Sequence, residues 1–382
     1  MLQFQDTQLA LIHIPLRLYP SFLQAILQLL LPTDAAEERP ISRGSGSSLD
    51  IKDHPFINVS ITPFECSIAL PRAIADSLFV PARDALNPAD QESVTITKED
   101  FVVMQVEGEG LEAGQRVLEL TSPLAMAGIS IFFITTYYLD YILVPLRARG
   151  QVISALEERG FAFQPSNAST TTGAYSHRAT TSTASAGIVS LPGTPPPTTV
   201  TELQLRTFAT LKKHNIVPTV DESIKLAHCA GNLNNTSTTT PNNDRLSLGL
   251  VQCLAAGPKF FSLTLTDTEE PSLLIERRML PFFSYTTPGS SEAHSVLQYS
   301  TADVLIPIIL DLRTLPIEST GIVCGVAGRL VGATKSGLDN AVEMSYLSTT
   351  KTGTVTVTEM DLERALAALR DGSGENGYRH AD

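Results

Sequence analysis

The sequence predicts an α+β fold made of four ferredoxin-like βαββαβ modules, arranged as two similar halves. Two observations support this prediction. Strand-like segments of period two alternate with helix-patterned segments, and their order is repeated after a Ser/Thr/Pro-rich stretch at residues 165–201. The chain has 382 residues, of which 43% are hydrophobic and 18% charged, so it has enough apolar mass for sizeable cores.

The two halves match most clearly in their hairpins. Phe56–Thr62 and Phe260–Thr266 both alternate between apolar and polar residues, as half-buried strands do, and each is followed by a turn and a second apolar run. Later in each half, another hairpin precedes a helix-patterned segment. In the second half that helix is Thr358–Arg370, where Thr358 and Asp361 form a typical start signal.

The first half is expected to contain a strand, a helix, a hairpin, a strand, a helix, a hairpin and a helix. In that order these are Leu9–Pro15, Ser21–Leu31, Phe56–Leu70, Asp100–Gln105, Arg116–Ala127, Ile129–Val144 and Leu146–Arg159. The segment 129–146 is long enough for a membrane helix, but Asp140 and its many β-branched and aromatic residues favour a buried hairpin.

The second half is expected to follow the same order. Leu203–Phe208 and Val304–Leu310 are the predicted first strands of its two modules. Ser223–Ala230 and Leu246–Ala256 are predicted to be helical on either side of an Asn-rich insertion, and Gly321–Val331 is the predicted helix of the last module.

Changes in composition set the predicted boundaries. The first two modules are residues 1–98 and 99–164, the linker is 165–201, and the last two modules are 202–300 and 301–382. Some segments are too polar to offset the entropy of ordering them and are expected to be flexible. They are the loops 37–48, 232–243 and 286–293, the linker, and the tail 371–382.

The composition excludes several classes of partner. The formal net charge is −13 and the longest basic runs are pairs, so no nucleic-acid partner is expected. The four cysteines are scattered and the seven histidines lack metal-ligand spacing, so neither a disulfide framework nor a metal site is predicted. The N-terminus lacks the basic flank of a secretory signal. We therefore expect a cytoplasmic protein with no membrane partner and no cofactor.

No arrangement typical of catalysis is present in the sequence. Val106–Leu111 contains two glycines but lacks the Lys-Ser/Thr of a phosphate loop, and Gly325–Gly328 lacks the full dinucleotide fingerprint. A protein without catalytic residues is therefore expected, with an enzyme whose site has no recognisable motif as the alternative.

Four βαββαβ modules in two halves joined by a linker resemble the CASTOR family, the cytosolic arginine sensors of animal TOR signalling, which consist of tandem ACT domains. The resemblance covers most of the chain outside the loops. It is clearest at Ser122–Pro145 in the second module and at Thr320–Gly328 and Leu347–Thr350 in the fourth. It implies a non-catalytic amino-acid sensor that regulates a protein partner in a TOR-pathway complex concerned with nutrient sensing.

In that family the ligand lies between the second and fourth modules. The resemblance implies a site made of Glu119, Leu120, Glu318, Ser319, Thr320, Gly321, Ile322, Val323, Ser348, Thr349 and Thr350. A helix that starts at Gly321 would offer backbone N–H groups to the carboxylate of an amino acid, and the glycine would allow close approach. Glu119 and Glu318 would receive the ammonium group or a basic side chain.

Three positions depart from the family pattern. Gly353 stands where the arginine sensors have an acidic residue, and Thr350 stands where they have an aromatic one. Another acid of the family falls near Ser319, and here Glu318 lies one residue earlier. Removing the charge partner of a buried guanidinium costs about 3–5 kcal/mol. Arginine, another amino acid, and a constitutive protein-interaction module with a decayed pocket are therefore all left open. A homodimer is also left open, because the modules could instead pair within one chain.

Overall fold

The structure is a computed structural model that describes residues 1–31, 56–107, 113–164, 197, 199–232, 242–286, 293–332 and 342–370. Of the segments expected to be flexible, 37–48 and 371–382 lie wholly outside the described residues. Most of 165–201, 232–243 and 286–293 also lies outside them. Within the described ranges, no helix combines the length and apolar character that crossing a bilayer requires.

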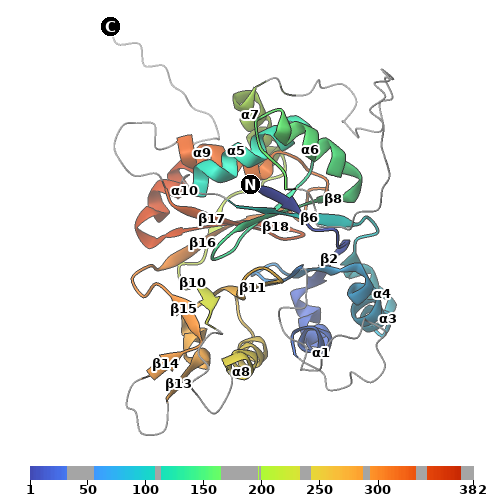
Figure 1. The fold of residues 1–382 in the computed structure, drawn as a ribbon, viewed down its shortest axis with the longest axis vertical. Helices are drawn as coiled ribbons and strands as arrows, with labels where there is room; N and C mark the ends of the chain where they lie inside the picture. Colours follow the sequence, from blue (N-terminus) through green and yellow to red (C-terminus); the bar gives the residue numbers. More distant parts are fainter. Residues whose placement is uncertain are drawn as a thin grey trace.

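Two layers of antiparallel strands lie face to face, and helices cover the outer face of each layer (Figure 1). The upper layer runs in the order β1 (Leu2–Phe4), β6 (Phe101–Val106), β8 (Asp140–Pro145), β7 (Phe132–Thr135), β17 (Met344–Ser348), β18 (Thr352–Thr358), β16 (Leu305–Asp311) and β9 (Thr219–Val220). The lower layer runs in the order β5 (Thr95–Ile96), β2 (Leu9–Pro15), β4 (Glu65–Pro71), β3 (Phe56–Ile61), β11 (Phe261–Thr266), β12 (Ser272–Glu276), β10 (Leu226–Gly231) and β15 (Leu297–Tyr299). A separate ribbon consists of β13 (Ser284–Thr286) and β14 (Ala293–Ser295).

Within the described residues the two layers form one sheet of 16 strands, and 12 of these strands close into a barrel-like ring; β1, β5, β9 and β15 lie outside the ring. Strands β2 and β6 pair at Leu9 and Phe101, and strands β10 and β16 pair at Leu226 and Leu305. Each half of the chain contributes strands to both layers, because β3 pairs with β11 in one layer and β7 with β17 in the other. The mixed helix and sheet content fits the predicted α+β class, whereas the closure of the sheet was not predicted.

The helices lie outside the strand layers, so the molecule has a hydrophobic core above, below and between them (Figure 1). The upper helices are α5 (Ala113–Met126), α6 (Arg149–Glu157), α7 (Val200–Lys213), α9 (Ile322–Gly332) and α10 (Leu362–Arg370). The lower helices include α1 (Tyr19–Leu30), α2 (Arg72–Ile74), α3 (Val80–Asp84), α4 (Pro88–Ser93) and α8 (Asn242–Ala255).

Three strands end at a proline, and a helical turn follows each of them directly. Pro15, Pro71 and Pro145 end β2, β4 and β8 with φ values of −57°, −52° and −55°. A proline ring fixes φ in this range and removes an N–H donor, so the ladder of strand hydrogen bonds stops there. The repetition of this ending is one local sign of the internal repeat.

The prediction of a strand at Leu203–Phe208 is wrong, because these residues lie within α7. Leu203, Thr207 and Leu211 are buried at helical spacing, whereas Leu205, which the strand pattern required on the same face as Leu203, is 65% exposed. The Thr199 hydroxyl accepts the Glu202 N–H at 3.1 Å, and this Thr-x-x-Glu capping pattern was the sequence signal that the strand prediction missed.

The prediction of a helix at Ser223–Ala230 is also wrong, because Leu226–Gly231 is β10. This strand pairs with β12 from Leu226 to Ala230, so tertiary pairing determines its conformation. The segment α7–β9 completes the upper layer: β9 pairs with β16 and α7 packs on α9. By contrast, Val304–Leu310 and Gly321–Val331 correspond closely to β16 and α9.

A line of polar side chains runs between the layers along the central pair β3–β11. The Asn58 amide donates to the Thr264 hydroxyl at 3.0 Å, and the hydroxyls of Ser60 and Ser262 lie 2.9 Å apart. All four residues are buried, and buried polar groups need such partners because water is excluded. The interior therefore combines an apolar cluster with a satisfied polar line.

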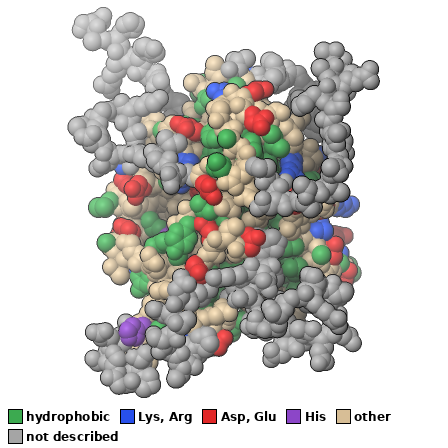
Figure 2. All heavy atoms as spheres, viewed as in Figure 1, with side chains coloured by type: hydrophobic (Ala, Val, Ile, Leu, Met, Phe, Trp, Pro, Cys, Tyr) green, Lys and Arg blue, Asp and Glu red, His purple; other side chains and the backbone are tan. Residues whose placement is uncertain are grey.

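Acidic side chains are dispersed over the face of the molecule seen in Figure 2. Among the described residues on that face they do not gather into one patch, and basic side chains also occur there.

The packing of α7 on α9 gives a prediction about two glycines of the same helix. A Cβ on Gly325 would lie 2.8 Å from Thr207 Cγ2, whereas a Cβ on Gly332 would meet no atom within 4 Å. We expect Gly325→Ala to lower the free energy of unfolding by about 1–3 kcal/mol through overpacking. Gly332→Ala should be neutral or stabilising by up to about 1 kcal/mol. Urea unfolding checks both, and equal effects would contradict the assigned contact.

Candidate ligand-binding site

A cavity of about 50 Å³ lies in the upper half of the molecule, between α5, the β16–α9 connection and the β17–β18 turn. Thr121 and Ala125 of α5 form one wall, Leu315–Ile317 of the connection form a second, and Tyr346 and Gly353 of the two strands form a third. A site for one water needs about 10–15 Å³ by a comparable measure. The cavity of about 50 Å³ therefore has room for about three to five groups of that size.

The start of α9 borders this cavity. Gly321 precedes the helix with φ = +81°, a conformation that glycine adopts without the strain a Cβ would cause. Its carbonyl accepts the Gly325 N–H at 2.8 Å and the Thr207 hydroxyl at 3.3 Å, so α7 supports the turn from behind. Within the described chain, the N–H groups of Ile322 and Val323 have no hydrogen-bond acceptor, as is usual for the first turn of a helix.

The predicted site residues fall into two groups. Seven of them line the cavity: Ser319, Gly321, Ile322, Val323, Ser348, Thr349 and Thr350. The other four do not line it: Glu119, Leu120, Glu318 and Thr320. Glu119 is exposed on α5, where its carboxylate accepts the Gln115 amide at 2.8 Å, and Leu120 lies in the core between the upper helices and strands. Glu318 and Thr320 are exposed in the connection.

Tyr346 and Gly353 are among the cavity residues that the sequence analysis did not include in the predicted site, although it named Gly353 as a departure from the family pattern. Tyr346 is 1% exposed, and burial raises the pKa of its phenol above the ordinary value. Gly353 lies opposite Ser348 in the β17–β18 pair, and a Cβ there would lie 2.7 Å from the Tyr346 hydroxyl oxygen. The alternation of β17 puts Tyr346 on the same face as Ser348, which is the signal that could have identified it.

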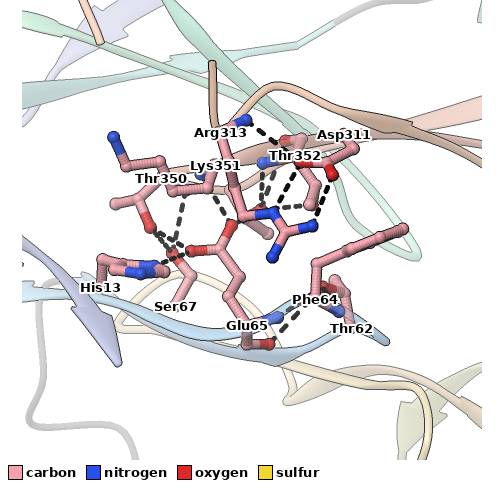
Figure 3. A network of polar contacts seen from close by, with 11 residues as sticks. His13, Thr62, Phe64, Glu65, Ser67, Asp311, Arg313, Thr350, Lys351 and Thr352 are labelled. Carbon is pink, nitrogen blue, oxygen red and sulfur yellow. Dashed lines mark hydrogen bonds and ion pairs between the residues drawn. The ribbon is translucent and has the colours of Figure 1, made fainter. Parts of the chain in front are cut away.

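Thr349 and Thr350 have a second role, because they hold a buried carboxylate of the lower layer (Figure 3). The Glu65 side chain is 0% exposed and lies at the start of β4. Its two oxygens accept the hydroxyls of Thr349 and Thr350, each at 2.5 Å, and Oε1 also accepts the Lys351 N–H at 2.7 Å. His13 Nδ1 lies 2.6 Å from Oε2.

These contacts satisfy a group that would otherwise be costly to bury. A carboxylate removed from water requires several donors, and the β17–β18 turn supplies three of them from the opposite layer. The Ser67 hydroxyl also accepts the Thr350 N–H at 3.1 Å. The cavity wall formed by residues 348–350 is therefore anchored to the lower layer, although no motif in the sequence pointed to Glu65.

The other half of the chain has a corresponding contact. The Tyr137 N–H, in the β7–β8 turn, donates to the Ser272 hydroxyl at 2.9 Å, as Thr350 does to Ser67. Beside it, Glu269 accepts the Tyr141 hydroxyl at 3.2 Å, and burial raises the pKa of the Glu269 carboxyl. Each of these two turns of the upper layer thus donates a hydrogen bond to a strand of the lower layer that belongs to the other half of the chain.

A second, smaller cavity of about 10 Å³ lies between the layers and is lined mainly by hydroxyl side chains. His228 borders it, with Nε2 3.5 Å from the Ser272 hydroxyl, and its ring stands edge-on to Tyr137. Burial lowers the pKa of His228 to about 4. The His228 imidazole is therefore neutral at pH 7.

The described residues contain no cluster of three His, Cys, Asp or Glu side chains that could hold a metal ion. All four cysteines are buried, and none of them forms a disulfide. Burial raises the pKa of Cys324, which is nearest the cavity, so its thiol is kept in the protonated form.

The Glu65 contacts predict a large effect of a small change. Glu65→Gln keeps the shape but replaces an acceptor oxygen with an NH₂ group that faces donors, so the free energy of unfolding should fall by about 3 kcal/mol. Glu92→Gln, on the exposed surface of α4, is the matched control and should change it by less than about 0.5 kcal/mol. Equal urea midpoints for the two variants would contradict the anchoring role.

His228 predicts a dependence of stability on pH. Its pKa of about 4 in the folded protein lies below the ordinary value of 6.5, so the unfolded chain takes up the proton first as the pH falls. The contribution of the neutral His228 to the free energy of unfolding is present above pH 6.5 and is lost as the pH falls towards 4. The free energy of unfolding should fall by about 2 kcal/mol between pH 7 and pH 5. Urea unfolding at both values should show this loss in the wild type and not in His228→Gln. A parallel loss in both proteins would refute it.

The comparisons with known proteins bear on one part of the chain. Residues 96–158 match the family model of the ACT domain, and this range contains β6, α5, β7, β8 and α6. An ACT domain suggests a ligand-binding regulatory role. A search of curated proteins finds no match.

Two solved structures are similar at low sequence identity. Aspartate kinase from Synechocystis is 11% identical with a TM-score of 0.32, and the match covers 97% of this chain and 55% of the kinase. A protein from Agobacterium tumefaciens is 16% identical with a TM-score of 0.26, and the match covers 43% of this chain and 90% of that protein. The chain thus spans about 55% of the length of the kinase. At these TM-scores, neither similarity supports a conclusion about this chain.

Proposed function

We propose that this chain is a non-catalytic regulatory protein that binds an amino acid in the cavity between α5 and the start of α9. The proposal rests on one observation: the cavity joins the first turn of α9 to the ACT domain at residues 96–158. Thr121, Ala125, Ile129, Ile131 and Phe132 of that domain supply the opposite wall. The proposal includes the division of the chain into four ACT-like modules. The first and third contribute most of their strands to the lower layer, and the second and fourth contribute theirs to the upper layer.

The chemistry of the cavity suits a zwitterion. The unpaired N–H groups of Ile322 and Val323, together with the positive end of the helix dipole, would hold a carboxylate. Hydroxyls and backbone carbonyls of the connection and of β17 would accept hydrogen bonds from an ammonium group. Glu119 and Glu318 lie outside the cavity, so this pose does not depend on either acid.

The finer proposal follows the resemblance to the CASTOR family. In it, the protein is a cytoplasmic amino-acid sensor of TOR-type nutrient signalling, and ligand binding orders the connection before Gly321 and changes the affinity for a protein partner. Linkage requires the partner to change ligand affinity by the same factor. The strand pairs β3–β11 and β7–β17 join the halves within one chain, which supports internal pairing of modules in place of a homodimer.

A constitutive protein-interaction module with a decayed pocket is the second candidate. The observation that favours it is the small volume of the cavity, about 50 Å³, together with the Tyr346 phenol that occupies the space beside Gly353. In that case partner capture from a lysate would not respond to amino acids.

Isothermal titration calorimetry against each common amino acid tests the proposal. We expect one or more to bind, and Ser319→Phe, which puts a ring at the half-buried rim of the cavity, to weaken that binding at least tenfold. Thr314→Phe is the control, because Thr314 is exposed in the same connection and does not line the cavity. Absence of heat with folded protein would favour the second candidate. Equal affinities of the two variants would place the ligand elsewhere.

A further inference from the structure

The size and the lining residues of the proposed ligand site indicate which amino acids it binds. We propose that the ligand is a small amino acid with an uncharged side chain, of the size of glycine, alanine or serine, and that Tyr346 determines this specificity. The inference rests on the proposed function, since it concerns the same cavity.

The first argument is the size of the cavity. Its volume of about 50 Å³ corresponds to about three to five water-sized groups. That is close to the space required by the carboxylate, ammonium group and one or two further heavy atoms of a small amino acid. A long side chain would have to extend past the half-buried rim at Ser319 or displace the core residues around the cavity, and close-packed interiors resist such displacement.

The second argument is the absence of charge. Among the described residues that line the cavity, none is acidic or basic. The ammonium and carboxylate groups of a ligand balance one another, but an additional charged side chain would have no partner there. Burying an unpaired charge is strongly unfavourable, so lysine, arginine, aspartate and glutamate are disfavoured.

The third argument is the Tyr346 hydroxyl. The residue is almost fully buried and borders the cavity, and in the described part of the chain its hydroxyl has no hydrogen-bond partner. A Cβ on Gly353 would lie only 2.7 Å from this oxygen, so the phenol lies directly over the strand where the cavity would otherwise be wider. A phenol can both donate and accept a hydrogen bond, and a bound polar group would satisfy it.

The position of Tyr346 is well fixed. Its N–H donates to the Thr135 hydroxyl at 3.1 Å, and its ring, like the Met344 side chain two residues earlier, packs in the core between the upper helices and strands. The ring therefore limits the length of the ligand, while the hydroxyl contributes a hydrogen bond. These two effects are separable by two different substitutions.

The test is calorimetry of the full chain with glycine, alanine, serine, leucine, glutamate and arginine. For the wild type, one of the three small amino acids should bind at least tenfold more tightly than leucine, glutamate or arginine. Tyr346→Phe should weaken that binding at least fivefold, because only the hydroxyl is lost. Tyr346→Ala should reduce the preference for small ligands and improve leucine binding relative to alanine, because the cavity lengthens.

Tyr141→Phe is the matched control. It removes a buried phenol that hydrogen-bonds Glu269 and does not line the cavity, so ligand affinities should not change. Tightest binding of arginine, or unchanged affinities in both Tyr346 variants, would overturn the assignment and leave an amino-acid sensor in place. If none of the amino acids binds the folded wild-type protein, both this inference and the proposed function are overturned.

Discussion

The buried carboxylate of Glu65 is the interaction on which the arrangement of the two strand layers most depends. It belongs to the lower layer, and three of its donors come from the β17–β18 turn of the upper layer. A charge in a water-free interior constrains its surroundings, since every donor it loses leaves a costly unpaired group. The layers therefore meet in one register, and residues 349–351 have little freedom to move.

The same turn is a wall of the proposed ligand cavity, so the interaction that joins the layers also shapes the site. Thr349 and Thr350 hold Glu65 with their hydroxyls and line the cavity. On the opposite side, α7 closes over the glycines of α9 and supports the Gly321 carbonyl. A ligand in this cavity would contact segments from both halves of the chain, which is the arrangement a regulatory protein needs to couple binding to a change elsewhere.

The sequence predicted the parts of the fold that local patterns determine. Alternating apolar residues located β2, β3, β4 and β16, and the small-residue run after Gly321 located α9. It failed where tertiary contacts decide. The expected repeat of the module order suggested a strand at Leu203–Phe208, but packing against α9 makes the segment helical, and pairing with β12 makes Leu226–Gly231 a strand. The predicted module boundaries stay predictions.

The candidate site was accessible to sequence reasoning only through the resemblance to a known family. That resemblance indicated the start of α9 and the β17–β18 turn, where the cavity lies. It gave no reason to single out Tyr346 or Glu65, because their importance comes from what surrounds them. A tyrosine in a strand pattern and a glutamate before a turn are ordinary in sequence, and only three-dimensional burial distinguishes them.

The most direct test of the central claim is a crystal structure of the protein grown with saturating amounts of whichever of glycine, alanine and serine binds most tightly in solution. The account predicts that amino acid between α5 and α9, with its carboxylate at the N–H groups of Ile322 and Val323 and a polar atom within hydrogen-bond distance of the Tyr346 hydroxyl. An empty cavity in a crystal that holds the amino acid elsewhere, or a cavity that remains closed by its own side chains, would contradict it.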